Sequence, residues 1–311
     1  MRLIQKMAGN AYVFLRRDDW RGFYDPAHSE VLDLLMEHDP IEIKATRTFN
    51  LQPNLVAEIP LGQIRVVLKN FGWRSFLHFL ASPFMASKAI NSFKAALHLL
   101  NNGLPTPKPL AAFEQRRWRL VKRNCYVTES LGPLPHVRDY LKLRPDGEAG
   151  AREVLALLGS YIRRMHDSGL FHRDLTLANF LLKDGELYLI DLNRSRLKKR
   201  MSFAQRLRDL ATPELEESDR NLFLRYYLGD GERLELWSQA LNLRTHLVRA
   251  GRKFRKWRRR VFGHRAPKKE DSLQAALSPR SLRTPGNRPG DETLKGKFLE
   301  TITFLFRIRA P

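Results

Sequence analysis

The sequence predicts an α+β protein with two lobes, a small β-rich N-terminal lobe followed by a helical C-terminal lobe. Two observations support this. Short runs of alternating apolar and polar residues dominate residues 41–131, and a period of two is typical of half-buried strands. After about residue 133, apolar residues recur every three or four positions, which is typical of amphipathic helices. The chain has 311 residues, enough for one large domain or two small ones.

The N-terminal part is expected to contain five strands and one long helix. Residues 1–40 are expected to form an extension, with a short helix after Asp25-Pro26. The strands are expected over residues 41–49, 54–61, 64–71, 111–115 and 118–129. The helix begins at Ser82-Pro83 and ends at Gly103. The β-rich lobe then spans residues 41–131.

The C-terminal lobe is expected over residues 132–243. Its first long helix covers residues 148–169 and places five residues on one face, namely Val154, Leu158, Tyr161, Ile162 and Met165. A hairpin with Asp184-Gly185 at its turn follows, and residues 203–243 are expected to form shorter helices. Residues 244–311 are expected to form a basic amphipathic segment and a poorly ordered tail.

The composition indicates a basic protein of a reducing compartment. Fifty-five basic and 33 acidic residues give a net charge of +22, which favours anionic partners such as nucleic acid, acidic lipid or phosphorylated sugar. The single cysteine, Cys125, excludes an internal disulfide. No apolar run has the length of a signal peptide or of a membrane span of roughly 18 residues, so we expect the protein in the cytoplasm. No histidine or cysteine spacing indicates a zinc site.

The stretch "LFHRDLTLANFLL", residues 170–182, carries the chemistry. Phosphoryl transfer from ATP needs a carboxylate to accept the proton of the attacking hydroxyl and oxygen ligands for Mg²⁺. Asp174 and Asn179 have the spacing of the protein-kinase catalytic loop, and Asp191 follows the strand-like run "LYLI". We therefore predict Asp174 as the catalytic base and Asn179 with Asp191 as the magnesium ligands.

The apolar residues of this stretch are expected to anchor the loop in the core. They are Leu175, Phe180, Leu181 and Leu182. A buried strand with a few satisfied polar groups is the alternative interpretation. The helix before the stretch, the hairpin after it and three chemical positions in register favour the catalytic one.

Two further segments are predicted to hold ATP. Lys69 lies at the end of the third expected strand, where kinases place the lysine that contacts the α- and β-phosphates. Residues 125–131 fall where the connection between the lobes is expected. Backbone groups from Glu129 to Leu131 are the candidates for adenine binding. ATP and Mg²⁺ are thus the predicted cofactors.

The sequence also departs from protein kinases. The loop after the first strand, "TRTFNLQPN", has no glycine, so Arg47, Thr48 and Asn50 become candidate phosphate contacts, with ordinary exposed polarity as the alternative. The run "SKAINSFKAALHLL" contains no acid. Three alternatives therefore remain for Lys69: it is unpaired, it pairs with Glu58, or it pairs with an acid elsewhere in the chain.

The segment after Asp191 is also unusual. Leu192 and Asn193 stand where protein kinases have Phe and Gly, and no Ala-Pro-Glu motif follows. The chain is therefore expected to lack the activation segment of protein kinases.

Four blocks together resemble the bacterial lipopolysaccharide kinase family, which includes heptose and 3-deoxy-octulosonic acid (Kdo) kinases. They are "NNGLPTPKPLAAFE", "YVTESLGPLPHVRDYL", "FHRDLTLANFLL" and "LYLIDLNRSR". The resemblance covers about residues 20–230. It implies a two-lobed protein-kinase-like fold, ATP with Mg²⁺, and transfer to a sugar hydroxyl of a lipid-linked glycan at the inner membrane. It also implies that Asp174 is the base, Asn179 and Asp191 bind metal, and Lys69 contacts phosphate.

Other functions compete with this one. The block "HRDLTLANFLL" is also similar to the small atypical kinase linked to tRNA threonylcarbamoyl-adenosine, which would make nucleic acid a partner. The connector "GLPTP" favours the sugar kinases instead. Aminoglycoside phosphotransferases share the fold, but a +22 protein would repel their cationic substrates. A non-catalytic scaffold is disfavoured because Lys69, Asp174, Asn179 and Asp191 are all present.

Two basic segments are candidate binding surfaces. Residues 193–208 contain seven cations and no acid, namely Arg194, Arg196, Lys198, Lys199, Arg200, Arg206 and Arg208. An anionic acceptor and a solvated surface are equally weighted explanations, and only the first predicts that neutralising Arg194 and Arg196 raises acceptor KM alone.

Residues 244–262 are expected to form a helix with nine cations and no acid. Its apolar stripe consists of Leu247, Ala250, Phe254, Trp257 and Val261. An anionic membrane surface is favoured over core packing and RNA. This predicts a peripheral protein on the cytoplasmic face of the inner membrane.

Overall fold

The computed structural model describes most of the first 262 residues. The described ranges are 4–7, 10–36, 45–50, 54–72, 87–118, 120–213, 215–229 and 234–262. Met1–Arg252 form one compact unit, and Lys253–Pro311 form a second. The expected tail after residue 262 lies outside the described residues.

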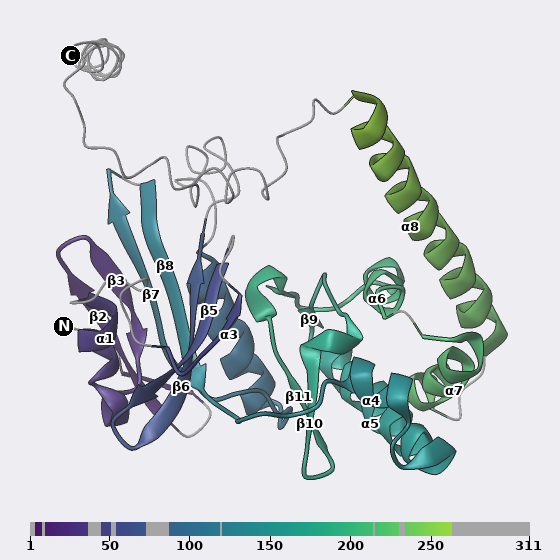
Figure 1. Ribbon diagram of the computed structural model, residues 1–311, viewed down its shortest axis with the longest axis horizontal. Coiled ribbons are helices and arrows are strands. Elements are labelled where there is room, and N and C mark those ends of the chain that lie inside the picture. Colours follow the sequence, from purple (N-terminus) through teal and green to yellow (C-terminus); the bar gives the residue numbers. More distant parts are fainter. Residues whose placement is uncertain are drawn as a thin grey trace, which may run out of the picture. The chain divides into compact units, whose positions relative to one another are not determined.

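The N-terminal lobe is built on one antiparallel sheet of eight strands (Figure 1). Its strands are β1 (Ile4–Met7), β2 (Asn10–Arg17), β3 (Trp20–Tyr24), β4 (Arg47–Asn50), β5 (Asn54–Leu61), β6 (Ile64–Phe71), β7 (Pro109–Arg117) and β8 (Leu120–Glu129). Their order is β1-β2-β3-β7-β8-β6-β5-β4. The segment expected as an N-terminal extension thus adds three strands to the sheet, because β3 pairs with β7 from Trp20 opposite Gln115 to Tyr24 opposite Ala111.

Helices cover both faces of this sheet. The 3-10 helix η1 (Pro26–His28) begins at Asp25, whose carboxylate accepts the Ala27 amide at 3.1 Å. It leads into α1 (Val31–Met36), which buries Val31 and Leu35. The long helix, α3 (Lys88–Asn101), begins after its N-cap Ser87, later than the start expected at Ser82-Pro83. Ser82 and Pro83 themselves lie outside the described residues.

Helix α3 connects the added strands to the rest of the lobe. The ring of Phe93 stacks on Phe23 at 5.4 Å and meets Tyr12 edge-on at 4.9 Å. These contacts explain why β2 and β3 join the sheet, since both strands bury aromatic rings against the helix.

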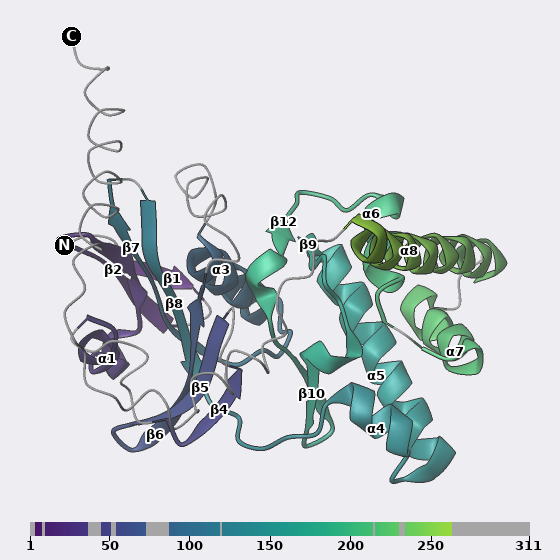
Figure 2. The same ribbon diagram turned by 45° about the horizontal axis from the view of Figure 1, so that its top comes forward.

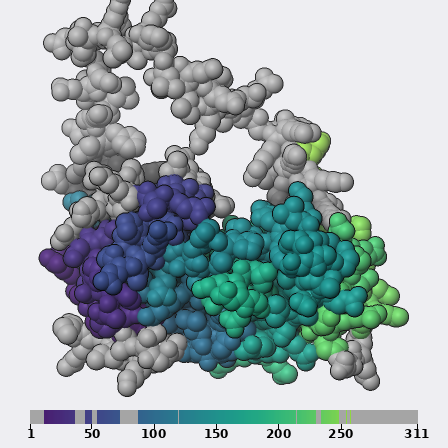
Figure 3. All heavy atoms as spheres, turned by 60° about the horizontal axis from the view of Figure 1, so that its bottom comes forward, coloured from purple at the N-terminus to yellow at the C-terminus, as the bar shows by residue number. Residues whose placement is uncertain are grey.

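The C-terminal lobe surrounds the long helix α5 (Gly147–Asp167). Its other elements are α4 (Val137–Leu143), β9 (Leu170–Phe171), η3 (Leu177–Asn179), β10 (Phe180–Lys183), β11 (Glu186–Leu189), η4 (Leu192–Arg194), β12 (Arg196–Leu197), α6 (Phe203–Leu210), α7 (Glu217–Leu228) and α8 (Leu234–Phe262). All five residues predicted for the buried face of α5 are buried. The β10–β11 hairpin turns at Asp184-Gly185, as predicted. Figure 2 shows this lobe beside the sheet, and Figure 3 shows the two lobes as adjoining surfaces.

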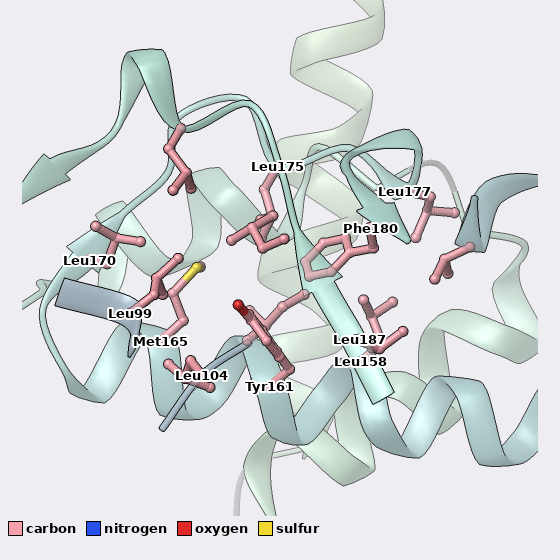
Figure 4. Close-up of a cluster of buried hydrophobic side chains, with 14 of the residues drawn as sticks. Leu99, Leu104, Leu158, Tyr161, Met165, Leu170, Leu175, Leu177, Phe180 and Leu187 are labelled. Atoms are coloured by element: carbon pink, nitrogen blue, oxygen red, sulfur yellow. The ribbon is translucent and has the colours of Figure 1, made fainter. Parts of the chain in front are cut away.

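The catalytic stretch is anchored in the largest apolar cluster (Figure 4). Leu175 and Phe180 are fully buried, and the Phe180 ring meets Tyr161 of α5 edge-on at 5.6 Å. Leu182 packs against the same cluster, as predicted. Leu181 does not, because it lines the cavity described below. The strand alternation of β10 explains this, since neighbouring side chains point to opposite faces.

Helix α8 changes character along its length. Near its start, Trp237 contacts the rings of Phe203 at 4.5 Å and Tyr227 at 5.8 Å, and Leu241 is buried. Further along, its large apolar residues are exposed, as described below. Among the described helices, none is both long and apolar enough to cross a membrane.

Candidate active site

An ion pair between the lobes lies at the centre of the site. The ammonium group of Lys69, on β6, contacts Oδ1 of Asp191, which lies between β11 and η4. Lys69 is thus paired with one of the candidate acids from elsewhere in the chain. Glu58 is not its partner: that buried carboxylate instead accepts a hydrogen bond from the hydroxyl group of Ser130. The structure therefore brings the predicted phosphate lysine and the predicted metal ligand into direct contact.

Asp191 has a backbone conformation that residues other than glycine rarely adopt. Its φ is 61°, and a non-glycine residue in this left-handed region costs about 1–2 kcal/mol. The amide group of Asn193 donates to Asp191 Oδ1 at 2.5 Å. Strain of this kind persists where surrounding contacts enforce it and is concentrated at functional sites.

The catalytic stretch places Asp174 and Asn179 next to Asp191. The Asn179 amide group donates to the carbonyl oxygen of Asp174 at 2.8 Å. The carbonyl oxygen of Asn179 accepts the amide of Ile190, the residue before Asp191, at 2.8 Å. Asp174, Asn179 and Asp191 thus share one corner of the lobe, although the roles predicted for them stay predictions.

The carboxylate of Asp174 faces a cation from the segment after Asp191. Its Oδ2 lies 3.0 Å from Nη1 of Arg194. The Asp174 side chain is 38% exposed, so it is accessible to an incoming hydroxyl. The neighbouring Arg173 has φ 72°, a second strained position in the same loop.

Asp209, at the end of α6, holds this strained loop. Its fully buried carboxylate accepts the backbone amides of His172 at 2.7 Å and Arg173 at 2.8 Å. Sequence reasoning missed this residue. The available signal was that Asp209 is the first acid after Asp191, at the end of a long basic run.

Buried histidines complete the support of the loop. Burial lowers the pKa of His172 and of His166, although the Asp209 carboxylate acts in the opposite direction on both. Both imidazoles are therefore neutral at pH 7. Nδ1 of His172 accepts the Asp174 amide at 3.3 Å, which places the proton of the neutral ring on Nε2.

Asp209→Ala is expected to destabilise the protein and to slow catalysis. The change leaves one buried and one partly buried amide without an acceptor, at about 1–3 kcal/mol for the buried one, and releases the backbone that carries Asp174. Urea unfolding and phosphotransfer rates measure the two effects. Glu148→Ala is the control, because that acid is 81% exposed. An unchanged free energy of unfolding in Asp209→Ala would contradict the assignment.

A cavity of about 670 Å³ opens beside these residues. The connection between the lobes forms one wall from Thr128 to Leu134, and Lys69 and Asp191 lie at its polar end. Apolar side chains line it from both lobes, among them Val56, Val67, Leu181 and Ile190. Such a cavity, apolar with a few polar groups at one end, suits a nucleotide with its base in the apolar part.

Sequence reasoning did not single out Val56, Val67 and Ile190, and it assigned Leu181 to the core. For Val67 the available signal was its spacing, since it precedes Lys69 by two residues on the same strand, β6. Side chains two apart on a strand share one face.

The connecting segment has few backbone groups left for adenine. The amide of Glu129 donates to the carbonyl oxygen of Lys108 at 2.9 Å, and the amide of Ser130 donates to the carbonyl oxygen of Arg65 at 2.9 Å. The Leu131 amide has no backbone acceptor among the described residues. The backbone groups that remain candidates for adenine binding are therefore the carbonyl oxygen of Glu129 and the amide of Leu131.

The glycine-free loop contributes one of its three candidate residues to the cavity. Arg47 lines it together with Phe49, and the guanidinium lies 5.4 Å from the centre of the Phe49 ring. Thr48 is not part of the described wall. The side chain of Asn50 lies outside the described residues.

The donor set at this corner fits magnesium. Asp191 offers a carboxylate and Asn179 an amide oxygen, and Mg²⁺ prefers oxygen ligands. The described residues contain no cluster of three or more acidic, histidine or cysteine side chains suited to a metal. Mg²⁺ is commonly bound through one or two protein side chains together with substrate phosphates.

Comparison with known proteins identifies the family. The model of the lipopolysaccharide kinase (Kdo/WaaP) family matches residues 69–227, just over half of the chain. The chain belongs to the lipopolysaccharide kinase (Kdo/WaaP) family. The matched segment contains the predicted base, metal ligands, phosphate lysine and adenine-binding residues of this family member, from Lys69 to Asp191.

Individual relatives match over shorter stretches. The 3-deoxy-D-manno-octulosonic acid kinase of Vibrio cholerae is 28% identical over 109 residues, 35% of this chain and 44% of the relative. The lipopolysaccharide core heptose(I) kinase WaaP of Escherichia coli K12 is 28% identical over 127 residues, 37% of this chain and 48% of the relative. The RIO-type serine/threonine-protein kinase Rio1 of Haloferax volcanii is 35% identical over 94 residues, 30% of this chain and 28% of the relative. The chain thus spans less than half the length of each of these relatives.

A solved structure supports the fold. The structure of WaaP in complex with acyl carrier protein superposes with a TM-score of 0.51 at 21% identity, covering 72% of this chain and 95% of that chain. The predicted α+β, two-lobed, protein-kinase-like fold is therefore confirmed.

Proposed function

We propose that this protein transfers the γ-phosphoryl group of ATP to a sugar hydroxyl of the lipopolysaccharide inner core, on Kdo or heptose. The observation that supports this most directly is the Lys69–Asp191 ion pair at the polar end of the cavity, beside Asp174 and Asn179. Family membership supports the acceptor class, because the relatives are named as Kdo and heptose kinases.

The residues have separate tasks in the proposed reaction. The apolar walls and the connecting segment hold adenine, and Lys69 binds the α- and β-phosphates. Asp174 accepts the proton of the attacking hydroxyl. Asn179 and Asp191 would hold Mg²⁺, which neutralises the phosphate charge when bound.

The exposed cations after Asp191 are the proposed contacts for an anionic acceptor. Arg196, Lys198, Lys199 and Arg200 are all exposed. Arg206 differs, because it contacts Asp167 at 2.7 Å and the Tyr227 hydroxyl at 3.3 Å and so supports the lobe.

The direct experiment is transfer of the γ-phosphoryl group of ATP to purified lipopolysaccharide from cells lacking this protein. Incorporation that requires Asp174 supports the proposal. Incorporation into protein or RNA in place of lipopolysaccharide would contradict it.

A kinase linked to tRNA modification is the second candidate. Similarity to the EKC/KEOPS complex subunit BUD32 of Yarrowia lipolytica, at 28% identity over 91 residues, supports it. Tight, salt-sensitive RNA binding would support this candidate over the sugar kinase.

Helix α8 supports a peripheral position on the cytoplasmic face of the inner membrane. Leu247, Phe254 and Trp257 of the predicted stripe are 60%, 59% and 52% exposed. The side chains of Ala250 and Val261 lie outside the described residues. Exposure of Leu247, which lies in the first compact unit, argues against core packing at that position. A basic helix with exposed aromatic residues suits an anionic membrane surface.

Phe254→Ser with Trp257→Ser is expected to weaken sedimentation with anionic liposomes. Each ring loses about 1.5–3 kcal/mol of apolar burial, and wild-type binding should require anionic lipid and weaken with salt. Leu236→Ser is the control, because Leu236 is 54% exposed in the same helix but outside the basic segment. Equal binding to neutral liposomes would contradict the membrane role. Unfolding of the double variant would instead identify the stripe as core.

A further inference from the structure

The catalytic loop has no cation between Asp174 and Asn179 to contact the transferred phosphoryl group. From Asp174 to Asn179 the sequence is "DLTLAN". During transfer, negative charge spreads over the equatorial oxygens of the phosphoryl group, and a positioned cation stabilises it. Lys69 is engaged by Asp191. Stabilising the transferred phosphoryl group therefore requires a second cation near Asp174.

We infer that Arg194 is this cation and that Asn91 of α3 positions it. This inference rests on the proposed phosphotransfer. Arg194 Nη1 lies 3.0 Å from the Asp174 carboxylate, and the side chain is 46% exposed. A guanidinium has five N–H donors, so contact with Asp174 leaves donors for phosphoryl oxygens at the same place.

The backbone on both sides of Arg194 is held by one side chain. The amide nitrogen of Asn91 donates to the carbonyl oxygen of Asn193 at 3.1 Å and to that of Ser195 at 2.8 Å. Leu192 and Ser195 are buried, which fixes the segment further. Arg194 therefore projects from a fixed backbone, as a preorganised charge requires.

Helix α3 contains no acidic residue that could pair with Lys69, and the contacts of Asn91 give the helix a different role. In this chain the helix does not supply the partner of Lys69, which is Asp191. It contacts the segment after Asp191 through Asn91. A shift of α3 would move the Arg194 backbone, so we assign Asn91 as a positioning residue and Arg194 as a catalytic residue.

The step is balanced without further reactants. The acceptor oxygen forms a bond to the γ-phosphorus as the bond to the β–γ bridging oxygen breaks, and ADP leaves with that electron pair. The hydroxyl proton passes to a carboxylate oxygen of Asp174. Arg194 neither gains nor loses a proton and stabilises the charge on the phosphoryl oxygens.

The test compares Arg194→Gln, Arg194→Lys and Asn91→Ala with the control Arg152→Gln, an exposed position on α5. Steady-state ATP hydrolysis gives kcat and KM. Calorimetry at fixed Mg²⁺ gives the affinities for ADP and for ADP with aluminium fluoride, which mimics the transferred group. Arg194→Gln should lower kcat by about 10²–10³-fold with little change in KM for ATP. It should weaken ADP–aluminium fluoride binding by a similar factor and spare ADP binding. Arg194→Lys should retain part of the wild-type kcat and part of the affinity for ADP–aluminium fluoride.

Asn91→Ala should lower kcat in the wild-type background but have little further effect in Arg194→Gln, because both changes act through one cation. The role of Arg194 would be overturned if Arg194→Gln hydrolysed ATP as fast as Arg152→Gln. It would also be overturned if Arg194→Gln lost affinity equally for ADP and for ADP with aluminium fluoride. Additive effects of the two changes would overturn the positioning role of Asn91. If wild type and Asp174→Asn hydrolyse ATP equally, the proposed function itself fails and this inference fails with it.

Discussion

Asp174→Asn is expected to lower kcat for phosphotransfer by about 10²–10⁴-fold, because asparagine cannot accept the hydroxyl proton. Stability should change by no more than about 1 kcal/mol, since the Asp174–Arg194 pair is partly exposed and such pairs contribute little. Transfer from labelled ATP and thermal unfolding measure the two quantities.

Asp184→Asn is the matched control for this change. Asp184 lies in the turn of the β10–β11 hairpin with φ 49°, a conformation that asparagine tolerates. Near-normal turnover by folded Asp174→Asn protein would remove Asp174 from the role of base.

Asp191→Ala is expected to be inactive at any practical Mg²⁺ concentration. The change removes a proposed metal ligand and the partner of Lys69 together. Losing several kcal/mol of charge stabilisation corresponds to a rate loss of about 10²-fold or more. The measurement is activity as a function of Mg²⁺ concentration.

Asp191→Asn separates metal loss from backbone strain. Asparagine adopts the left-handed conformation of Asp191, where φ is 61°, but carries no charge. It should therefore fold normally and need more Mg²⁺ than wild type. An unchanged Mg²⁺ dependence in either variant would exclude Asp191 from the metal site.

Features fixed by local pattern could be predicted from the sequence. The buried face of α5, the turn at Asp184-Gly185 and the helical basic segment each follow from residues within a few positions of one another. The fold class could be predicted for the same reason, because the change from period two to period 3.6 is visible along the chain.

Features fixed by distant pairing could not be predicted. Nothing in the alternation of residues 10–24 shows that β3 pairs with β7, which lies about ninety residues later. Asp209 and Asn91 act on backbone groups far away in sequence, and no local period encodes such contacts. Leu181 was misassigned to the core because hydrophobicity alone does not tell a cavity wall from a packed interior.

The phosphate content of the lipopolysaccharide inner core tests the proposed function most directly. Mass spectrometry would compare cells with the protein, cells without it, and deleted cells that express wild type or Asp174→Asn. The account predicts that an inner-core phosphate disappears on deletion, returns with wild type and does not return with Asp174→Asn. An inner core with the same phosphate content in all four would contradict it.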